Sequence, residues 1–143
     1  MEAPFTKQQI DSVIKNLPMD KSPGPDGFTN NFVKECWEFL AEDFYKLIDD
    51  FYHGRVSLKS INGSFIALIP KKDAPVCPND FRPISLLNCS FKIITKLLAN
   101  RLQKIILSMI HANQYGFLNN RSIQDCLAWS YEFTHQCHAS GKN

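Results

Sequence analysis

Two apolar runs joined by a connection rich in proline, aspartate and asparagine constrain the fold of this chain more than any other feature. The runs are Phe65–Ile69 and Ile84–Leu87. Because proline removes a main-chain donor and breaks helices, no helix can cross the connection between them. Short apolar runs bounded by such turn residues are typical of β-strands. The stretch from Ile66 to Leu87 therefore predicts a β-hairpin.

Three cations fall near the loop end of this predicted hairpin. Lys71 and Lys72 follow the first run, and Arg82 stands at the start of the second. Lysine supplies a mobile point charge and arginine a fixed fork of donors, so the three could cradle a polyphosphate. The alternative is a hairpin edge that carries charge to prevent edge-to-edge pairing and binds no ligand. Spacing alone favours the charged edge, because no phosphate-loop glycines accompany the cations.

Apolar residues at helical spacing predict helices on both sides of the hairpin. Capping boxes at Thr6–Gln9 and Ser122–Asp125 begin the first and the last of them. The predicted helices cover residues 7–17, 30–53, 88–110 and a stretch after Ser122; the second is one helix or two with a break near Ala41, ended by Gly54. Residues 22–27 predict a rigid turn, and residues 114–120 an irregular segment. The expected fold class is α+β, mainly helical with one β-hairpin.

Charge is distributed unevenly along the chain, although the net charge is only +2. Residues 1–53 contain five Lys/Arg and ten Asp/Glu, whereas residues 54–143 contain eleven and four. Such asymmetry hints at a polyanionic partner for the basic part, and ordinary surface variation explains it equally well. In the predicted helix 88–110, Lys92, Lys96 and Lys104 lie on or beside one polar stripe. This stripe can follow a nucleic-acid backbone or simply be solvated.

Composition bears on several classes of protein. With 143 residues, 44% of them hydrophobic, the chain is long enough for one domain with its own core. Its five cysteines are odd in number and never form a Cys-x-x-Cys pair, so we expect them to be reduced and mostly buried. His135 and His138 alone make no zinc site. No apolar run approaches the ~18 residues of a membrane helix, and we do not expect the residues that begin with Met1-Glu-Ala-Pro to act as a signal peptide. We therefore expect a soluble intracellular protein, nuclear or cytoplasmic.

Five sequence blocks, in order, resemble reverse transcriptases. LIPKK at residues 68–72 and FRPISLLN at residues 81–88 resemble the first two conserved blocks of these enzymes in plant non-LTR retrotransposons of the long interspersed element kind. The other three blocks are KSPGPDGF at residues 21–28, KIITKLLANRL at residues 92–102 and QYGFLNNRSIQD at residues 114–125. The resemblance runs from about Pro4 to the end of the chain.

The resemblance implies roles for particular side chains. Lys71, Lys72 and Arg82 would contact the triphosphate of a deoxynucleoside triphosphate. Gln114 and Arg121 would line the template or nucleotide pocket, although Arg121 could instead pair with Asp125 or Glu132. Lys92, Lys96 and Lys104 would contact the backbone of an RNA or RNA/DNA template-primer.

The distribution of acidic residues bears on catalysis. A complete enzyme of this family would copy RNA into DNA with magnesium, and polymerases use two metal ions about 3.5–4 Å apart, held by converging carboxylates. After Gly54 the acidic residues are Asp73, Asp80, Asp125 and Glu132, and their predicted positions form no such pair. We therefore expect no catalytic residue, no metal ligand and no activity in this chain alone.

The interpretation that follows is a partial reverse transcriptase domain over residues 1–143. It would comprise an N-terminal extension and the fingers side of a right-hand polymerase fold and end before the first catalytic aspartate strand. Palm and thumb would be absent, and those missing segments would be its partners. Two alternatives stay open: a basic module that binds nucleic acid without chemistry, and an inert remnant of a mobile element.

Overall fold

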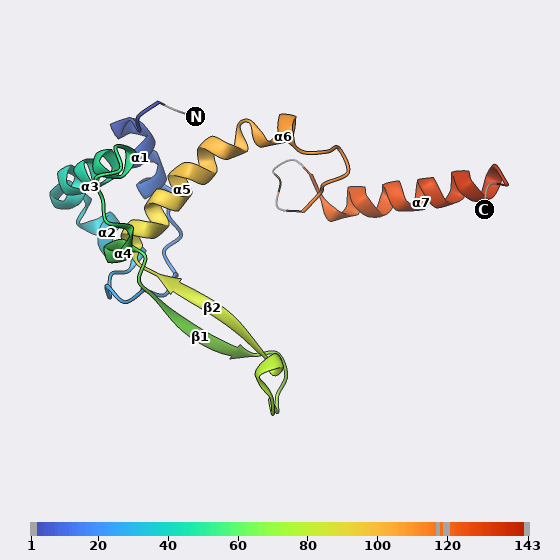
Figure 1. Cartoon of the computed structure of the whole chain (residues 1–143), viewed down its shortest axis with the longest axis horizontal. Helices are drawn as coiled ribbons and strands as arrows, with labels where there is room; N and C mark the ends of the chain where they lie inside the picture. The colour runs from blue at the N-terminus through green and yellow to red at the C-terminus, as the bar shows by residue number, and fades with distance from the viewer. Residues whose placement is uncertain (1–2, 117, 119–120, 142–143) are drawn as a thin grey trace. The chain divides into compact units, whose positions relative to one another are not determined.

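The computed structural model describes residues 3–116, 118 and 121–141 (Figure 1). In chain order the elements are α1 (Lys7–Lys15), α2 (Asn30–Glu35), α3 (Trp37–Tyr52), α4 (Leu58–Ile61), β1 (Ser64–Pro70), the 3-10 helix η1 (Pro78–Asp80), β2 (Phe81–Leu87), α5 (Cys89–Gln103), α6 (Ile106–Met109) and α7 (Ile123–Ala139). They form two compact units, residues 1–98 and residues 99–143.

Strands β1 and β2 form a two-stranded antiparallel sheet, which confirms the predicted hairpin. The register pairs Ser64 with Leu87 at the base and Pro70 with Phe81 at the loop end. Both strands are edge strands, so Pro83 can occupy β2 without depriving a second neighbour of a hydrogen bond. The described residues thus combine helices with one antiparallel sheet, as the expected α+β class requires.

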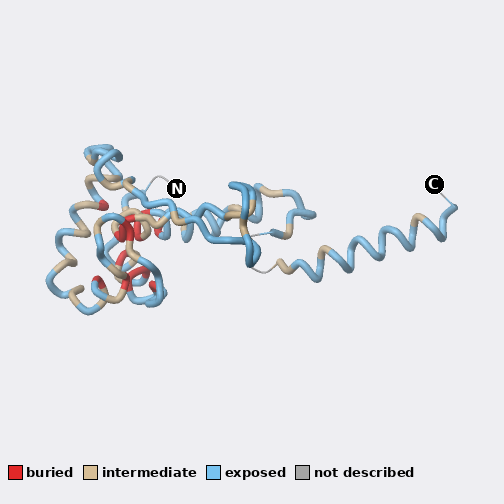
Figure 2. Tube along the Cα trace, turned by 90° about the horizontal axis from the view of Figure 1, so that it is seen from below, coloured by how far each residue is buried: buried red, intermediate tan, exposed pale blue. Residues whose placement is uncertain are grey.

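Residues of α1, α2, α3 and α5 make the buried core of the first unit. Figure 2 colours the buried residues red. The core residues are Ile10, Val13, Ile14, Leu17, Val33, Ile48, Cys89, Ile93, Ile94 and Leu97. Burial of each large aliphatic side chain contributes about 1.5–3 kcal/mol before the cost in conformational entropy. Because the first three turns of α5 belong to this core, the helix that follows the hairpin is anchored where the hairpin ends.

For the helices before the hairpin, the structure agrees with the predicted capping box and with the predicted helix end at Gly54, but not with the predicted break. The side chain of Thr6 accepts from the main-chain N–H of Gln9 and Gln9 reciprocates, so the predicted capping box is confirmed. The break in the second helix lies at Cys36 and not near Ala41. At this break the indole Nε1 of Trp37 donates to Asp11 Oδ1 at 3.1 Å, a contact between α3 and α1. Gly54, with φ +70°, ends α3 as predicted.

The predicted helix over residues 88–110 is interrupted in the structure. α5 ends at Gln103, and the four-residue α6 follows. The main-chain N–H groups of Lys104 and Ile105 donate to carbonyls three residues earlier, on Arg101 and Leu102. This tightening of the last turn satisfies end carbonyls and terminates the helix, so the expectation of one continuous helix was wrong.

The cysteines are free, as expected, but most are not buried. Cys89 is buried, Cys77 is exposed, and the other three are intermediate, so the expectation of mostly buried cysteines was wrong. Burial raises the pKa of the Cys89 thiol to about 11, and the negative charge of Asp26 adds to the shift. Cys89 is therefore a neutral core residue and not a nucleophile.

The second unit is built around α7. The side chain of Ser122 accepts from the main-chain N–H of Asp125, and Asp125 reciprocates, so the second predicted capping box is confirmed. Large apolar side chains on α7 are exposed, including Trp129 at 64% and Tyr131 at 76%. Residues 117, 119 and 120 of the segment expected to be irregular lie outside the described residues. In the part of the chain that the structure describes, no helix is both long and apolar enough to cross a bilayer.

Candidate functional site

The base of the hairpin is held against the turn formed by residues 22–27. An added Cβ on Gly24 would lie 2.4 Å from the carbonyl carbon of Leu87 and 2.6 Å from the main-chain nitrogen of Asn88. No side chain fits at such distances, so only glycine allows this approach of two backbones. The turn therefore packs directly on the residues that connect β2 to α5.

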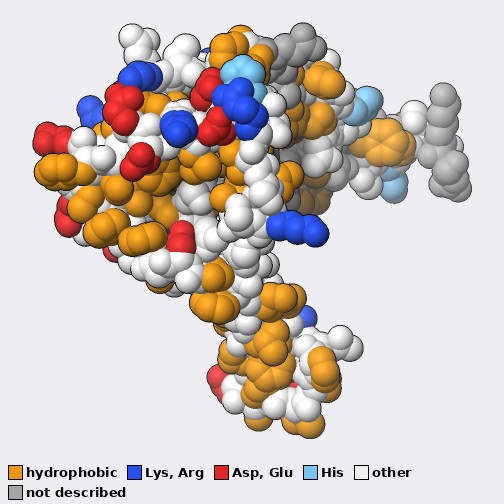
Figure 3. Space-filling model, turned by 60° about the vertical axis from the view of Figure 1, so that its left-hand side comes forward, with side chains coloured by type: hydrophobic (Ala, Val, Ile, Leu, Met, Phe, Trp, Pro, Cys, Tyr) orange, Lys and Arg blue, Asp and Glu red, His pale blue; other side chains and the backbone are white. Residues whose placement is uncertain are grey.

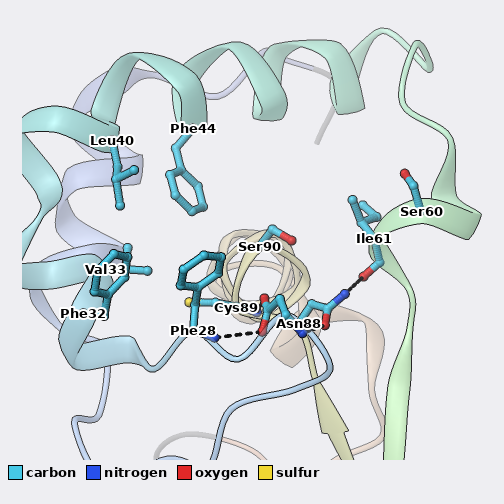
Figure 4. A pocket seen from close by; sticks show the side chains of 11 residues that line it. Phe28, Phe32, Val33, Leu40, Phe44, Ser60, Ile61, Asn88, Cys89 and Ser90 are labelled. Atoms are coloured by element: carbon cyan, nitrogen blue, oxygen red, sulfur yellow. Dashed lines mark hydrogen bonds between the residues drawn. The ribbon is translucent and has the colours of Figure 1, made fainter.

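Two side chains fasten this contact. The main-chain N–H of Asp26 donates to Asn88 Oδ1 at 3.1 Å, and the main-chain N–H of Cys89 donates to Asp26 Oδ2 at 2.7 Å. Asn88 Nδ2 donates to the carbonyl of Ile61 at 3.2 Å, just before β1 begins (Figure 4). Asn88 thus connects the segment before β1 with the segment after β2, at the base of the hairpin. Asp26 places a carboxylate at the N-terminus of α5, where the helix dipole favours a negative charge. We call Gly24, Asp26 and Asn88 the hairpin clasp.

A cavity of about 320 Å³ borders the hairpin clasp (Figure 4). Its aromatic wall is formed by Phe28, Phe32 and Phe44, while Asp26 and Asn88 contribute polar atoms. The rings of Phe28 and Phe32 stack with their centroids 5.1 Å apart. The cavity leaves part of this side of the clasp unpacked.

At the opposite end of the hairpin, Asp80 organises the loop. Its Oδ2 accepts from the main-chain N–H groups of Val76 and Cys77 at 2.9 and 3.1 Å. Its Oδ1 lies 2.9 Å from Lys72 Nζ, and its carbonyl accepts from the main-chain N–H of Lys71 at 2.7 Å. The N–H of Val76, the ammonium of Lys72 and the N–H of Cys77 lower the pKa of Asp80 to about 2.

The three predicted phosphate-binding cations all lie at this end of the hairpin. Lys71 Nζ donates to the carbonyl of Asn79 at 2.7 Å, and Lys72 pairs with Asp80. Arg82 is exposed and pairs with Ile69 in the strand register. Its guanidinium has no hydrogen-bond or ion-pair partner among the described residues. Each ammonium keeps donors beyond the one it uses. The placement of the cations matches the prediction, and their phosphate-binding role stays a prediction.

Of the three lysines predicted to lie along one polar stripe, only Lys92 and Lys96 lie on α5. Lys92 Nζ donates to the carbonyl of Ser22 at 2.7 Å, so this lysine helps hold the 22–27 turn. Lys96 is one helical turn further along α5 and is exposed. Lys104 lies one residue beyond the end of α5 and is not part of its helical face. Lys96 is therefore the member of the set best able to contact a phosphate backbone.

Gln114 and Arg121 lie together in the second unit. Arg121 Nη1 donates to the carbonyl of Gln114 at 2.6 Å and to that of His111 at 2.9 Å. Asp125 serves in the capping box, and Glu132 accepts from Gln136, so the alternative pairing of Arg121 with either acid was wrong. The two main-chain carbonyls fix the guanidinium and leave its Nε and Nη2 donors without partners among the described residues.

The magnesium ions that the resemblance implies do not fit the described residues. No group of three or more His, Cys, Asp or Glu side chains in residues 3–116, 118 and 121–141 could hold a metal ion. Asp80 is occupied by the hairpin loop, and Asp125 by the cap of α7. Asp80 and Asp125 therefore make structural bonds, and the described residues form no two-metal centre.

Sequence reasoning identified the cations but missed the residues that arrange them. Asp26 lies in KSPGPDGF and Asn88 in FRPISLLN, but the sequence gives neither a role, because a hydrogen bond across 62 residues leaves no local pattern. For Asp80, the sequence raised only the question of a metal ligand. Its position just before β2 and after a proline was the available signal, since aspartate there can accept from nearby turn amides.

Comparison with known proteins places these residues in a family context. The family model described as reverse transcriptase (RNA-dependent DNA polymerase) matches residues 69–143. The transposon TX1 uncharacterized 149 kDa protein of Xenopus laevis is 32% identical over 126 residues, which are 87% of this chain and 10% of that protein. The RNA-directed DNA polymerase from mobile element jockey of Drosophila melanogaster is 30% identical over 132 residues, or 82% of this chain and 14% of the relative. The probable RNA-directed DNA polymerase from transposon BS, also of Drosophila melanogaster, is 31% identical over 83% of this chain and 14% of its own length. The chain thus spans about a tenth to a seventh of the curated relatives it matches.

Proposed function

The chain belongs to the reverse transcriptase family, and we propose that its hairpin loop binds the triphosphate of a deoxynucleoside triphosphate for an RNA-directed DNA polymerase. In this proposal Lys71, Lys72 and Arg82 contact the phosphates. Two of the relatives are described as RNA-directed DNA polymerases from a transposon and from a mobile element, which supports a non-LTR retrotransposon origin. A plant origin stays a prediction.

One observation carries the proposal: two ammonium groups are fixed by the loop while donors remain free. Lys71 is fixed by the Asn79 carbonyl and Lys72 by Asp80. Arg82 adds a guanidinium that pairs with none of the described side chains. A charged edge that only prevents strand pairing gains nothing from fixed ammonium groups, since charge alone suffices. A phosphate site does gain, because fixing a lysine beforehand lowers the entropy lost on binding.

We assign the hairpin and the helical core of the first unit to the fingers side of the polymerase. Arg121 and Gln114 belong to the template or nucleotide pocket in this proposal. The guanidinium held by two carbonyls supports that role, because its remaining donors form a fork suited to a phosphate or base edge. Exposed Lys96 would contact the template-primer backbone, and Lys104 follows it in the sequence. Lys92 instead donates to the carbonyl of Ser22.

Catalysis itself lies outside this proposal. The whole family enzyme would use magnesium held by carboxylates, and palm and thumb segments would supply them. The described residues offer no such ligand set, so we assign this chain binding and positioning only.

The test compares alanine substitutions of two cations in the full chain. Binding of a fluorescent deoxynucleoside triphosphate is measured for Arg82→Ala, Lys72→Ala and the control Lys59→Ala, which removes an exposed lysine of α4. We expect Arg82→Ala to weaken binding about tenfold, because bidentate contacts with phosphate are the stronger ones, and Lys72→Ala to weaken it less. Equal losses from both would favour the charged edge, and so would a loss of the same size from Lys59→Ala.

The binding module without chemistry is the second candidate, and the exposed position of Lys96 favours it. A titration with nonspecific RNA at several salt concentrations tests it. Neutralised phosphates release counterions, so Lys96→Ala should reduce the salt dependence of binding by about one charge. Tight RNA binding without triphosphate binding would favour this candidate over the first.

A further inference from the structure

We infer that Asp80 is a positioning residue that arranges Lys72 and the loop for the triphosphate, an inference that rests on the proposed function. An acidic side chain among three cations looks unfavourable for an anion site. Asp80 nevertheless makes more contacts than any of the cations: two loop amides, one ammonium and, through its carbonyl, the ladder bond to Lys71.

The two carboxylate oxygens of Asp80 have separate tasks. Oδ2 accepts from Val76 and Cys77 and shapes the loop, whereas Oδ1 faces Lys72 Nζ at 2.9 Å. The side chain of Asp80 is 16% exposed and that of Lys72 is 55% exposed. The carboxylate is therefore partly enclosed by the loop, while the ammonium it holds stays open to a ligand. An ammonium has three donors, and Asp80 uses one.

This division makes two substitutions informative. Asp80→Asn keeps a carbonyl oxygen that can accept from the loop amides, but it turns an amide NH₂ toward Lys72 and releases that lysine. Asp80→Ala removes both sets of contacts. If Asp80 is a positioning residue, affinity for a polyphosphate falls in Asp80→Asn and falls further in Asp80→Ala.

Simple electrostatics predicts the opposite sign. Removal of a negative charge near three cations raises the local positive potential, so both substitutions would tighten anion binding. Asp73 provides the matched control, because it is an exposed carboxylate of the same connection and has no partner among the described residues. Asp73→Asn should leave affinity unchanged or raise it slightly.

The experiment uses the full chain and inorganic tripolyphosphate, with affinity measured by titration calorimetry. We expect Asp80→Asn to weaken binding about threefold, because the released Lys72 side chain must be ordered again when the ligand binds. We expect Asp80→Ala to weaken binding about tenfold, because the loop must then be ordered as well. Wild-type affinity or tighter binding in Asp80→Asn overturns the inference while the proposed function stands. Absence of binding in the wild type, under conditions where it is folded, overturns the proposed function and the inference together.

A double-substitution cycle tests whether Asp80 acts through Lys72. In the Lys72→Ala background, Asp80→Asn should no longer weaken binding, because the ammonium it would release is gone. An equal loss in both backgrounds would contradict a role through Lys72. Amide exchange gives a readout besides affinity: the amides of Val76 and Cys77 should stay protected in Asp80→Asn and lose protection in Asp80→Ala.

Discussion

Asp26 and Asn88 are hydrogen-bonded to each other although 62 residues separate them in the sequence. The main-chain N–H of Asp26 donates to Asn88 Oδ1, and the carboxylate of Asp26 accepts from the residue that follows Asn88. The block KSPGPDGF and the block FRPISLLN therefore meet at one point, where the hairpin leaves the helical core. The orientation of the loop cations depends on this point, because the hairpin carries them.

Replacement of Asn88 by alanine should destabilise the first unit. Asn88 is 9% exposed, and its loss leaves the Asp26 N–H and the Ile61 carbonyl without their partners. Each unsatisfied buried group costs about 1–3 kcal/mol. We expect a loss of about 2–4 kcal/mol in the free energy of unfolding, measured by denaturant titration. Asn100→Ala, at an exposed site of α5, is the control and should change stability by less than about 0.5 kcal/mol.

Replacement of Gly24 by alanine should force the two backbones of the hairpin clasp apart. The new methyl group would overlap the Leu87 carbonyl and the Asn88 nitrogen, which are main-chain atoms and cannot rotate away. Overpacking of this kind costs about 1–3 kcal/mol.

The matched control is Gly63→Ala. Its Cβ would lie 3.7 Å from Asn88 Nδ2, an ordinary contact distance, so the stability should hardly change. Equal melting temperatures for the two variants would contradict the close approach at Gly24.

Local patterns predicted most of the elements, and long-range contacts explain what they missed. The capping boxes and Gly54 act within a few residues, so the helix ends at Thr6, Gly54 and Ser122 could be predicted. The break at Cys36 accompanies a contact between Trp37 and Asp11 on another helix, which no local pattern contains. The candidate cations were visible as a charged cluster. Their fixation was not, because Asn79 holds Lys71 through its main chain, and any residue there has the same carbonyl.

Acid should loosen the hairpin loop in a defined pH range. Three donors lower the pKa of Asp80 to about 2, whereas an unfolded aspartate has a pKa near ~3.9. A depressed pKa means that the charged form is favoured in the folded loop. Its contribution is therefore complete above about pH 4 and is lost as the pH falls toward 2.

The measurement is a comparison of wild type with Asp80→Ala, which removes the carboxylate that accepts from the loop amides. The difference in amide protection of Val76 should be constant above about pH 4 and shrink below it. A difference that persists unchanged to pH 2 would show that the Asp80 charge has no part in holding the loop.

Purified chain should not extend a primer on an RNA template with magnesium or manganese. The described residues contain no cluster of potential ligands for a metal ion, and nucleotide positioning alone leaves the charge on the leaving group unstabilised. The assay measures incorporation of labelled nucleotide above a no-enzyme background. Incorporation that Asp73→Asn or Asp80→Asn abolished would place a catalytic centre in the hairpin connection and contradict this assignment.

Exposed apolar side chains on the hairpin should bind a hydrophobic dye. Ile66 and Leu68 are 67% and 61% exposed, and their alternation along β1 puts them on one face. Hydrophobic side chains gather on the surface of the hairpin (Figure 3). Apolar surface that is uncovered over several neighbouring residues attracts dyes and other proteins. We expect the 143-residue chain to bind ANS or to self-associate at micromolar concentration, as followed by fluorescence and sedimentation.

The variant Ile66→Thr/Leu68→Thr separates the hairpin from other exposed apolar sites. Threonine is a good strand former, so the hairpin should persist while its apolar face is lost. Dye fluorescence should fall more in this variant than in Phe39→Lys, which removes one isolated ring of α3 that is 85% exposed. If Phe39→Lys lowered the fluorescence as much, scattered surface residues would account for the dye. A monomer that binds no dye would mean that the hairpin is covered in solution by contacts that the structure does not contain.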